Sequence, residues 1–121
     1  MKMMNNLLLG VMMMGFSEAV TFAEQCGLSL ESIFDTIFSG PLGCFAYQLK
    51  EDMFKTGEYP AQFPLKHMTK DLRFALQTAD EQGAALPGGH MAFQLFRQAM
   101  GKNLGDYDLA AVKKIVESYR D

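Results

Sequence analysis

A lysine and two amide side chains stand close together at the start of the chain and could take part in carbonyl chemistry. Lys2 and Asn6 are four residues apart, so a helix would present both on one side, with Asn5 beside them. An ammonium group can donate a proton to a carbonyl oxygen while hydride reaches the carbon, and an amide can hold the same oxygen or a carboxylate. The spacing by itself is more typical of a solvated chain end.

A second group of candidates is basic. Lys66, Lys70 and Arg73 occupy neighbouring positions on one predicted helix, a strip that suits phosphate or carboxylate groups. Such a strip is usually only the solvated face of its helix. Asp71 lies among these cations and could pair with them within the helix.

The remaining reactive side chains do not form a recognisable site. His67 and His90 are far apart, without acidic or cysteine partners at ligand spacing, and no P-loop, nucleophile elbow or dinucleotide fingerprint occurs. Cys26 and Cys44 show no C-x-x-C spacing. We therefore predict no metal site, and two reduced, packed thiols in a cytoplasmic protein.

These residues must be positioned by helices. The first 26 residues predict one long helix, apolar around most of its circumference, which belongs in the middle of the fold. We expect its buried face to consist of Met4, Leu7, Leu8, Val11, Met12, Phe16, Ala19, Phe22 and Ala23.

Five further helices follow the 3.6-residue period and no segment alternates with period two. The second begins after the cap Ser29 and the last after the cap Asp108. We expect one all-α domain over residues 1–121, about six helices around the long N-terminal one. The other helices are predicted at 30–39, 42–55, 64–82, 90–102 and 109–119, with Phe45, Leu49, Met91, Met100 and Tyr119 among their buried residues. In the helix over 42–55, Lys50 is expected to face solvent. The helix over 64–82 is expected to bury a stripe formed by Leu65, Met68, Leu72, Ala75, Leu76 and Ala79.

Charge and hydropathy limit the partners. The net charge of −3, without a basic stripe, argues against a nucleic-acid binder. The N-terminal apolar run superficially resembles a signal peptide, but Asn5, Asn6, Glu18 and Glu24 interrupt it and the helical pattern continues beyond. The run is also shorter than a bilayer needs, so no membrane association is expected.

Several segments, taken together, resemble one known family. Lys2-Met3-Met4-Asn5-Asn6 is similar to the K-x-x-[NH]-N segment of the β-hydroxyacid dehydrogenases, such as 3-hydroxyisobutyrate dehydrogenase. The most specific run, Phe63-Pro64-Leu65-Lys66-His67-Met68-Thr69-Lys70-Asp71-Leu72, resembles the glyoxylate/succinic semialdehyde reductase branch. The resemblance covers essentially the whole chain, continuing in Glu18, Ala23-Glu24-Gln25-Cys26-Gly27-Leu28, Leu86-Pro87 and Asp106-Tyr107-Asp108.

This resemblance implies that the chain is the helical C-terminal domain of an enzyme that acts on a small hydroxyacid or aldehyde. The implied fold is similar to the C-terminal domain of 6-phosphogluconate dehydrogenase. Lys2 matches the catalytic lysine, a general acid in reduction and a base in oxidation. Asn6 matches the amide that positions the substrate and that lysine, and Asn5 lies where relatives have Asn or His. Lys70 matches the lysine that reaches the cofactor, NADP or NAD, across the domain cleft, and Asp71 helps to hold that end of the helix.

The family's Rossmann domain, with its glycine fingerprint, would precede Lys2 and is absent from these 121 residues. We therefore expect the chain alone to bind no cofactor and to be inactive, because positioning is the main contribution of an enzyme to hydride transfer. The long apolar helix, deprived of that domain, predicts a homodimer.

Two other interpretations stay open. The chain could be a stand-alone helical dimerisation module without catalysis, or a small exported helical protein. An upstream reading frame that encodes the glycine fingerprint would favour the enzyme domain, and an intact N-terminal mass in the native host would exclude export.

Overall fold

The computed structural model describes residues 1–120, and these residues form helices and connecting loops without a β-strand, which confirms the predicted all-α class. An isolated antiparallel bridge joins Pro64 to Asp108. The helices are α1 (Lys2–Gln25), α2 (Leu30–Ser39), α3 (Phe45–Gln48), α4 (Glu51–Thr56), α5 (Leu65–Gln82), α6 (Pro87–Gly101), the 3-10 turn η1 (Leu109–Val112) and α7 (Lys113–Glu117).

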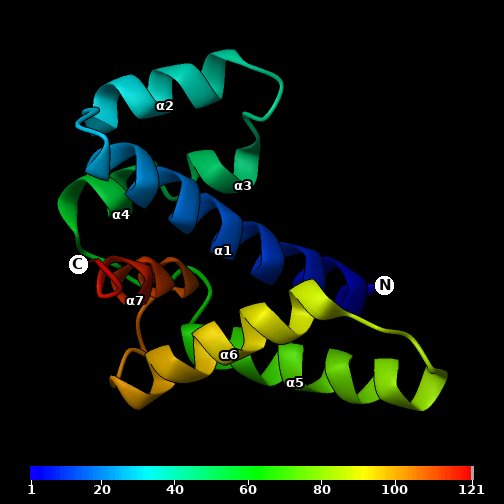
Figure 1. Cartoon of the computed structure of the whole chain (residues 1–121). Helices are drawn as coiled ribbons and strands as arrows, with labels where there is room; N and C mark the ends of the chain where they lie inside the picture. The colour runs from blue at the N-terminus through cyan, green and yellow to red at the C-terminus, as the bar shows by residue number, and fades with distance from the viewer. Residues whose placement is uncertain (121) are drawn as a thin grey trace.

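The long helix α1 is central, as predicted. It contacts α5, α6, α7 and η1 on one side and α2 and α3 on the other. Figure 1 shows α1 running between the α2–α3 pair and the α5–α6 pair. The N-terminal turn of α1 is therefore placed beside α5 and α6, where the basic strip lies.

The buried face of α1 differs from the predicted one. Met4, Leu8, Ala19 and Phe22, expected inside, are exposed. Because α1 is apolar nearly all round, its hydropathy selects no single face, and small residues decide where neighbouring helices approach. The buried residues are Gly10, Met13, Phe16, Ser17, Val20 and Thr21.

The predicted helix over 42–55 is also wrong in detail, because the chain breaks it into α3 and α4. Phe45 and Leu49, expected inside, are exposed, and Lys50, expected in solvent, is buried. The ammonium group of Lys50 lies 2.9 Å from the carboxylate of Asp108, an ion pair that draws this part of the chain inward. Met91, Met100 and Tyr119 are likewise exposed rather than buried, and so is Cys26.

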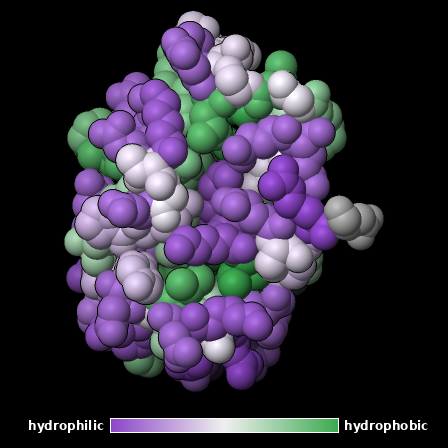
Figure 2. All heavy atoms as spheres, turned by 90° about the vertical axis from the view of Figure 1, so that its left-hand side faces the viewer, coloured by the Kyte–Doolittle hydropathy of each residue, from purple (hydrophilic) through white to green (hydrophobic). Residues whose placement is uncertain are grey.

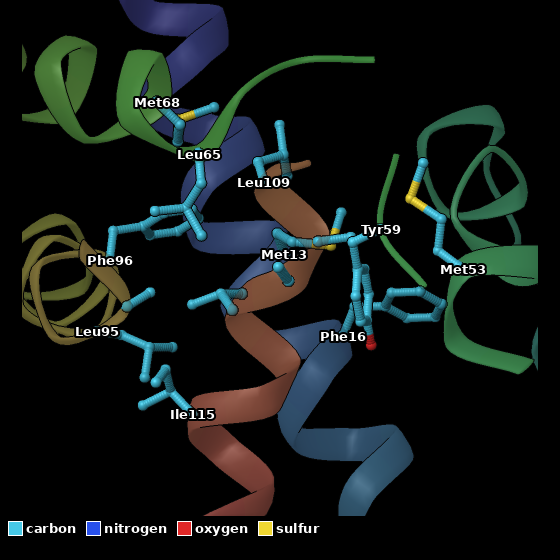
Figure 3. Close-up of a cluster of buried hydrophobic side chains, with 14 of the residues drawn as sticks. Met13, Phe16, Met53, Tyr59, Leu65, Met68, Leu95, Phe96, Leu109 and Ile115 are labelled. Atoms are coloured by element: carbon cyan, nitrogen blue, oxygen red, sulfur yellow. The ribbon is translucent and has the colours of Figure 1, made fainter. Parts of the chain in front are cut away.

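The core surrounds the middle of α1 (Figure 3), with side chains from α4, α5, α6, η1 and α7 meeting there. The Phe16 ring stacks on Tyr47 and Phe54, with centroids 4.1 and 5.0 Å apart. The predicted stripe of α5 is confirmed, because Leu65, Met68, Leu72, Ala75, Leu76 and Ala79 are all buried.

α1 has 24 residues and is long and apolar enough to cross a membrane by length and composition alone, so the prediction that the apolar run is too short for a bilayer was wrong. About a third of its most apolar window is buried inside the fold. A core helix of a soluble protein meets the same criterion. Figure 2 shows a mainly hydrophilic face with small apolar patches on the α4 and α7 side of the molecule.

Candidate functional site

The structure brings two of the predicted site residues into one pocket. Lys2 at the start of α1 and Lys70 in α5 both line a pocket of about 300 Å³. The remaining lining residues are Gln62, Phe63, Pro64, His67 and Asp71. We call this the Lys2 pocket. Lys2 and Lys70, which are far apart in the sequence, therefore line one pocket.

Asn6 reaches the same region through Asp71. Its side-chain amide donates a 2.7 Å hydrogen bond to Asp71 Oδ2. Lys2, Asn6 and Asp71 also line an adjoining pocket of about 260 Å³, together with Met3 and Phe74. Asp71 thus holds the amide of α1 rather than pairing with the basic strip, and it fixes the start of α1 against α5.

Asn5 is not brought into this group. Its side chain is exposed, and it lines neither of the two pockets. In a helix, neighbouring positions diverge by about 100°, so Asn6 faces α5 while Asn5 does not. The roles assigned to Lys2, Asn5, Asn6 and Lys70 remain predictions.

The wall of the Lys2 pocket at Gln62 and Phe63 is held by a buried carboxylate. Oδ1 of Asp108 accepts hydrogen bonds from the backbone N–H groups of Gln62 and Phe63, at 2.9 and 3.0 Å. Oδ2 accepts from the N–H of Ala110 at 3.0 Å, which confirms the predicted helix cap. The side chain predicted as a cap therefore also positions a loop 45 residues away.

Lys50 completes this network and was missed by sequence reasoning. Its ammonium group donates to Gln62 Oε1 at 3.1 Å and pairs with Asp108 at 2.9 Å, and both partners of the ion pair are buried. A buried lysine and a buried aspartate require each other, since an isolated charge in the interior is costly. Helical periodicity places Lys50 in solvent and carries no signal of this contact.

His67 was also missed as a pocket residue. It lies three positions before Lys70, so the same turn of α5 presents both side chains to the Lys2 pocket. That spacing was the only available signal. Within residues 1–120, no group of three or more His, Cys, Asp and Glu side chains could hold a metal ion.

The described residues thus form an all-helical domain that brings two lysines and an amide–carboxylate pair close together. Residues 1–116 match the family described as NAD-binding of NADP-dependent 3-hydroxyisobutyrate dehydrogenase. The chain belongs to this 3-hydroxyisobutyrate dehydrogenase family.

Individual relatives agree with this placement. The chain is 35% identical over all its residues to glyoxylate/succinic semialdehyde reductase 1 of Arabidopsis thaliana, of which it covers 42%. It is similar to the crystal structure of 3-hydroxyisobutyrate dehydrogenase from Salmonella typhimurium, with a TM-score of 0.88, 25% identity and coverage of 94% of this chain and 40% of that one. It also matches 3-hydroxyisobutyrate dehydrogenase of Mycobacterium tuberculosis, with a TM-score of 0.84, 27% identity and coverage of 95% and 42%.

These comparisons confirm the predicted family resemblance. The chain spans about two fifths of the length of each of these relatives. It is therefore similar to one helical part of them, and the family as a whole binds NAD(P).

Proposed function

We propose that this chain is the helical C-terminal part of an NAD(P)-dependent 3-hydroxyacid dehydrogenase or aldehyde reductase, to which it contributes the proton-transfer lysine. The observation that carries the proposal is the position of Lys2 and Lys70 in one pocket, next to the Asn6–Asp71 hydrogen bond. The substrate is a small hydroxyacid or aldehyde, of the kind named for the relatives.

In this proposal Lys2 acts directly on the reacting oxygen. Its ammonium group donates a proton to the carbonyl oxygen during reduction, and its neutral amine removes the proton from the hydroxyl in the reverse direction. The Asn6 amide has two N–H donors, and one of them donates the hydrogen bond to Asp71. The other donor is free to hold the substrate oxygen or carboxylate.

The lysines also suit the cofactor. Two ammonium groups facing one pocket fit the negative charge of NAD or NADP, and Lys70 is the residue we assign to its contact. When bound, the cofactor supplies the hydride. The helical residues described here contain no sheet of the kind that binds a dinucleotide, so we expect this chain alone to bind no cofactor productively.

The test compares the chain with a fusion. NADPH absorbance is followed with glyoxylate or succinic semialdehyde, first with the 121-residue chain and then with the N-terminal domain of the Arabidopsis relative joined before Met1. We expect no turnover from the chain and measurable turnover from the fusion. In the fusion, Lys2→Ala should lower kcat by about 10²-fold or more.

Lys55→Ala is the control for this experiment, because Lys55 is an exposed lysine of α4, outside both pockets that Lys2 lines, and forms an ion pair with Glu51. A Lys2→Ala fusion as active as the Lys55→Ala fusion would show that Lys2 does not transfer the proton. Turnover by the unfused chain would overturn the expectation that it is inactive.

We also propose that the chain forms a homodimer through the N-terminal half of α1. A groove of about 430 Å³, lined almost entirely by apolar atoms, runs between this half of α1 and residues 85–89. Met4 and Leu8 line it and are more than half exposed. A two-fold axis would allow each copy to insert Leu8 against the other copy's groove, which removes both apolar surfaces from water.

Analytical ultracentrifugation tests the dimer. We expect the dimer mass for the chain, the monomer mass for Leu8→Glu, and the dimer mass for Phe45→Glu, which alters an exposed apolar residue of α3 outside the groove. A monomer mass for the unmodified chain refutes the proposal.

The alternative is a helical dimerisation module without catalysis, which the exposed apolar side of α1 favours. The two functions differ in the fusion experiment. A fusion that forms dimers and binds NADPH but gives no turnover, with or without Lys2, would favour the module.

A further inference from the structure

A second pocket shares Lys70 with the Lys2 pocket. It has a volume of about 350 Å³ and lies between α5 and α6. We call it the α5–α6 pocket. Its lining residues are Lys66, Thr69, Lys70, Arg73, Arg97, Met100 and Gly101. Four of these seven side chains are cations, in a chain whose net charge is −3.

The two arginines are held together by one aromatic ring. Arg73 of α5 and Arg97 of α6 lie over Phe93, with guanidinium carbons 5.4 and 5.8 Å from the ring centroid. The ring supports both guanidinium planes by cation–π contact, so less rotamer freedom is lost when they bind a ligand. Two like charges are thereby kept at one pocket.

These cations have few anionic partners of their own. Within residues 1–120, Lys70, Arg73 and Arg97 form no salt bridge. Asp71, the acidic residue between two of them in sequence, accepts the hydrogen bond from Asn6 instead. The positive charge of the pocket is therefore available to a ligand.

Lys66 is the exception. Its ammonium group lies 2.7 Å from Asp106 Oδ1. This hydrogen bond, together with the charge of Lys66, lowers the pKa of Asp106. The Asp106 side chain is 85% exposed, and it competes with any anion that would approach Lys66.

We propose that the α5–α6 pocket is an anion site for a phosphate or pyrophosphate group, bound by Arg73, Arg97 and Lys70. Guanidinium groups bind phosphate oxygens in a bidentate manner, and an ammonium group adds a third charge-assisted hydrogen bond. Arg73 and Arg97 do not line the Lys2 pocket, so this site goes beyond the proposed redox function.

The test uses the 121-residue chain and inorganic pyrophosphate, titrated at low ionic strength by calorimetry, with amide chemical shifts to locate the site. We expect saturable binding that shifts amides of α5 and α6 and weakens with added salt. Arg73→Gln and Arg97→Gln should each weaken it about tenfold or more. Arg120→Gln, with the same charge change outside the pocket, should leave the affinity unchanged.

Asp106→Asn adds a test in the opposite direction. Removal of the competing carboxylate should tighten pyrophosphate binding about threefold, whereas Asp35→Asn, on an exposed position of α2, should not. An absence of saturation, or equal losses in Arg97→Gln and Arg120→Gln, would overturn the site in favour of general charge attraction.

Two competitors identify the source of the phosphate. Displacement of pyrophosphate by NADP assigns the site to phosphates of the cofactor, and displacement by glucose 6-phosphate assigns it to a separate phosphorylated ligand. Either result supports the site. Because the titration needs no turnover, its failure leaves the fusion experiment on Lys2 unaffected, and the reverse also holds.

Discussion

The side-chain amide of Asn6 donates a 2.7 Å hydrogen bond to the carboxylate of Asp71, and this contact ties the first turns of α1 to α5. Asp71 lines both of the pockets that Lys2 lines, and Asn6 lines one of them. The geometry of the proposed proton-transfer site therefore depends on a bond that also holds the fold together.

The coupling between Asn6 and Asp71 can be measured directly. We expect Asn6→Ala and Asp71→Ala each to lower the free energy of unfolding. Because either substitution already removes the hydrogen bond, the double mutant should lose less than the sum of the two single losses, by about 1 kcal/mol or more. Urea denaturation of the four proteins gives this value. Strict additivity would show that the bond contributes nothing.

The buried pair Lys50–Asp108 should contribute more. Asp108→Ala leaves the ammonium group of Lys50 without its charged partner in the interior and removes the acceptor of three backbone N–H groups. We expect a loss of about 3–5 kcal/mol in the free energy of unfolding.

Its control is Asp106→Ala, two positions earlier, which removes an exposed ion pair with Lys66 and should change stability little. Chemical denaturation measures both variants. Equal stability of the two would mean that the buried ion pair is dispensable.

Two glycines of α1 should respond in opposite directions. A side chain at Gly10 would begin 3.1 Å from Leu72 Cδ2, whereas nothing lies within 4 Å of the corresponding point at Gly15. We expect Gly10→Leu to destabilise by about 1–3 kcal/mol through overpacking. Gly15→Leu should stabilise by about 0.5–1 kcal/mol, since leucine is the better helix former.

Thermal unfolding of the two variants checks this pair. A Gly10→Leu variant with an unchanged or higher Tm would show that α1 and α5 do not need to approach closely at this point.

Tyr59 should make the protein sensitive to alkali. Burial raises the pKa of its hydroxyl, with a further increase from Glu117 and Glu24. The unfolded chain releases this proton above about pH 10, while the folded protein retains it, so stability is full below that pH and falls as the pH rises.

Above about pH 10, the free energy of unfolding should fall less steeply with pH in Tyr59→Phe than in the unmodified protein. We expect the two slopes to differ by up to about 1.4 kcal/mol per pH unit. Tyr107→Phe, at an exposed ring, should keep the original slope. Urea denaturation at a series of alkaline pH values measures both, and identical slopes in the two variants would contradict the assignment to Tyr59.

Much of the fold could be predicted from the sequence because the information is local. The caps Ser29 and Asp108 were identified from residue type and position, and each accepts the expected backbone hydrogen bond. The buried stripe of α5 followed from the 3.6-residue period on a helix with one clearly polar side. Where polarity is on one side only, the sequence by itself decides which face is buried.

The errors share a different cause. α1 is apolar nearly all round, so its face was decided by close approach at small residues such as Gly10. Lys50 was drawn inside by a carboxylate 58 positions later, a contact that no local pattern contains. Arg97 joined Arg73 only because α6 packs beside α5 and Phe93 supports both side chains.

The sequence by itself therefore determined the helical class, the bounds of α1, α2 and α5 to within a residue, and the family-like segments that contain Lys2, Asn6 and Lys70. It placed the start of α6 three residues too late and did not show the breaks between α3 and α4 or between η1 and α7. Only the tertiary structure decided that Lys2 and Lys70 share a pocket, that Asp71 binds Asn6, and that Asp108 holds the pocket wall. The physical reason is range: helix periodicity and capping act over a few residues, whereas ion pairs and packing join positions that only folding brings together.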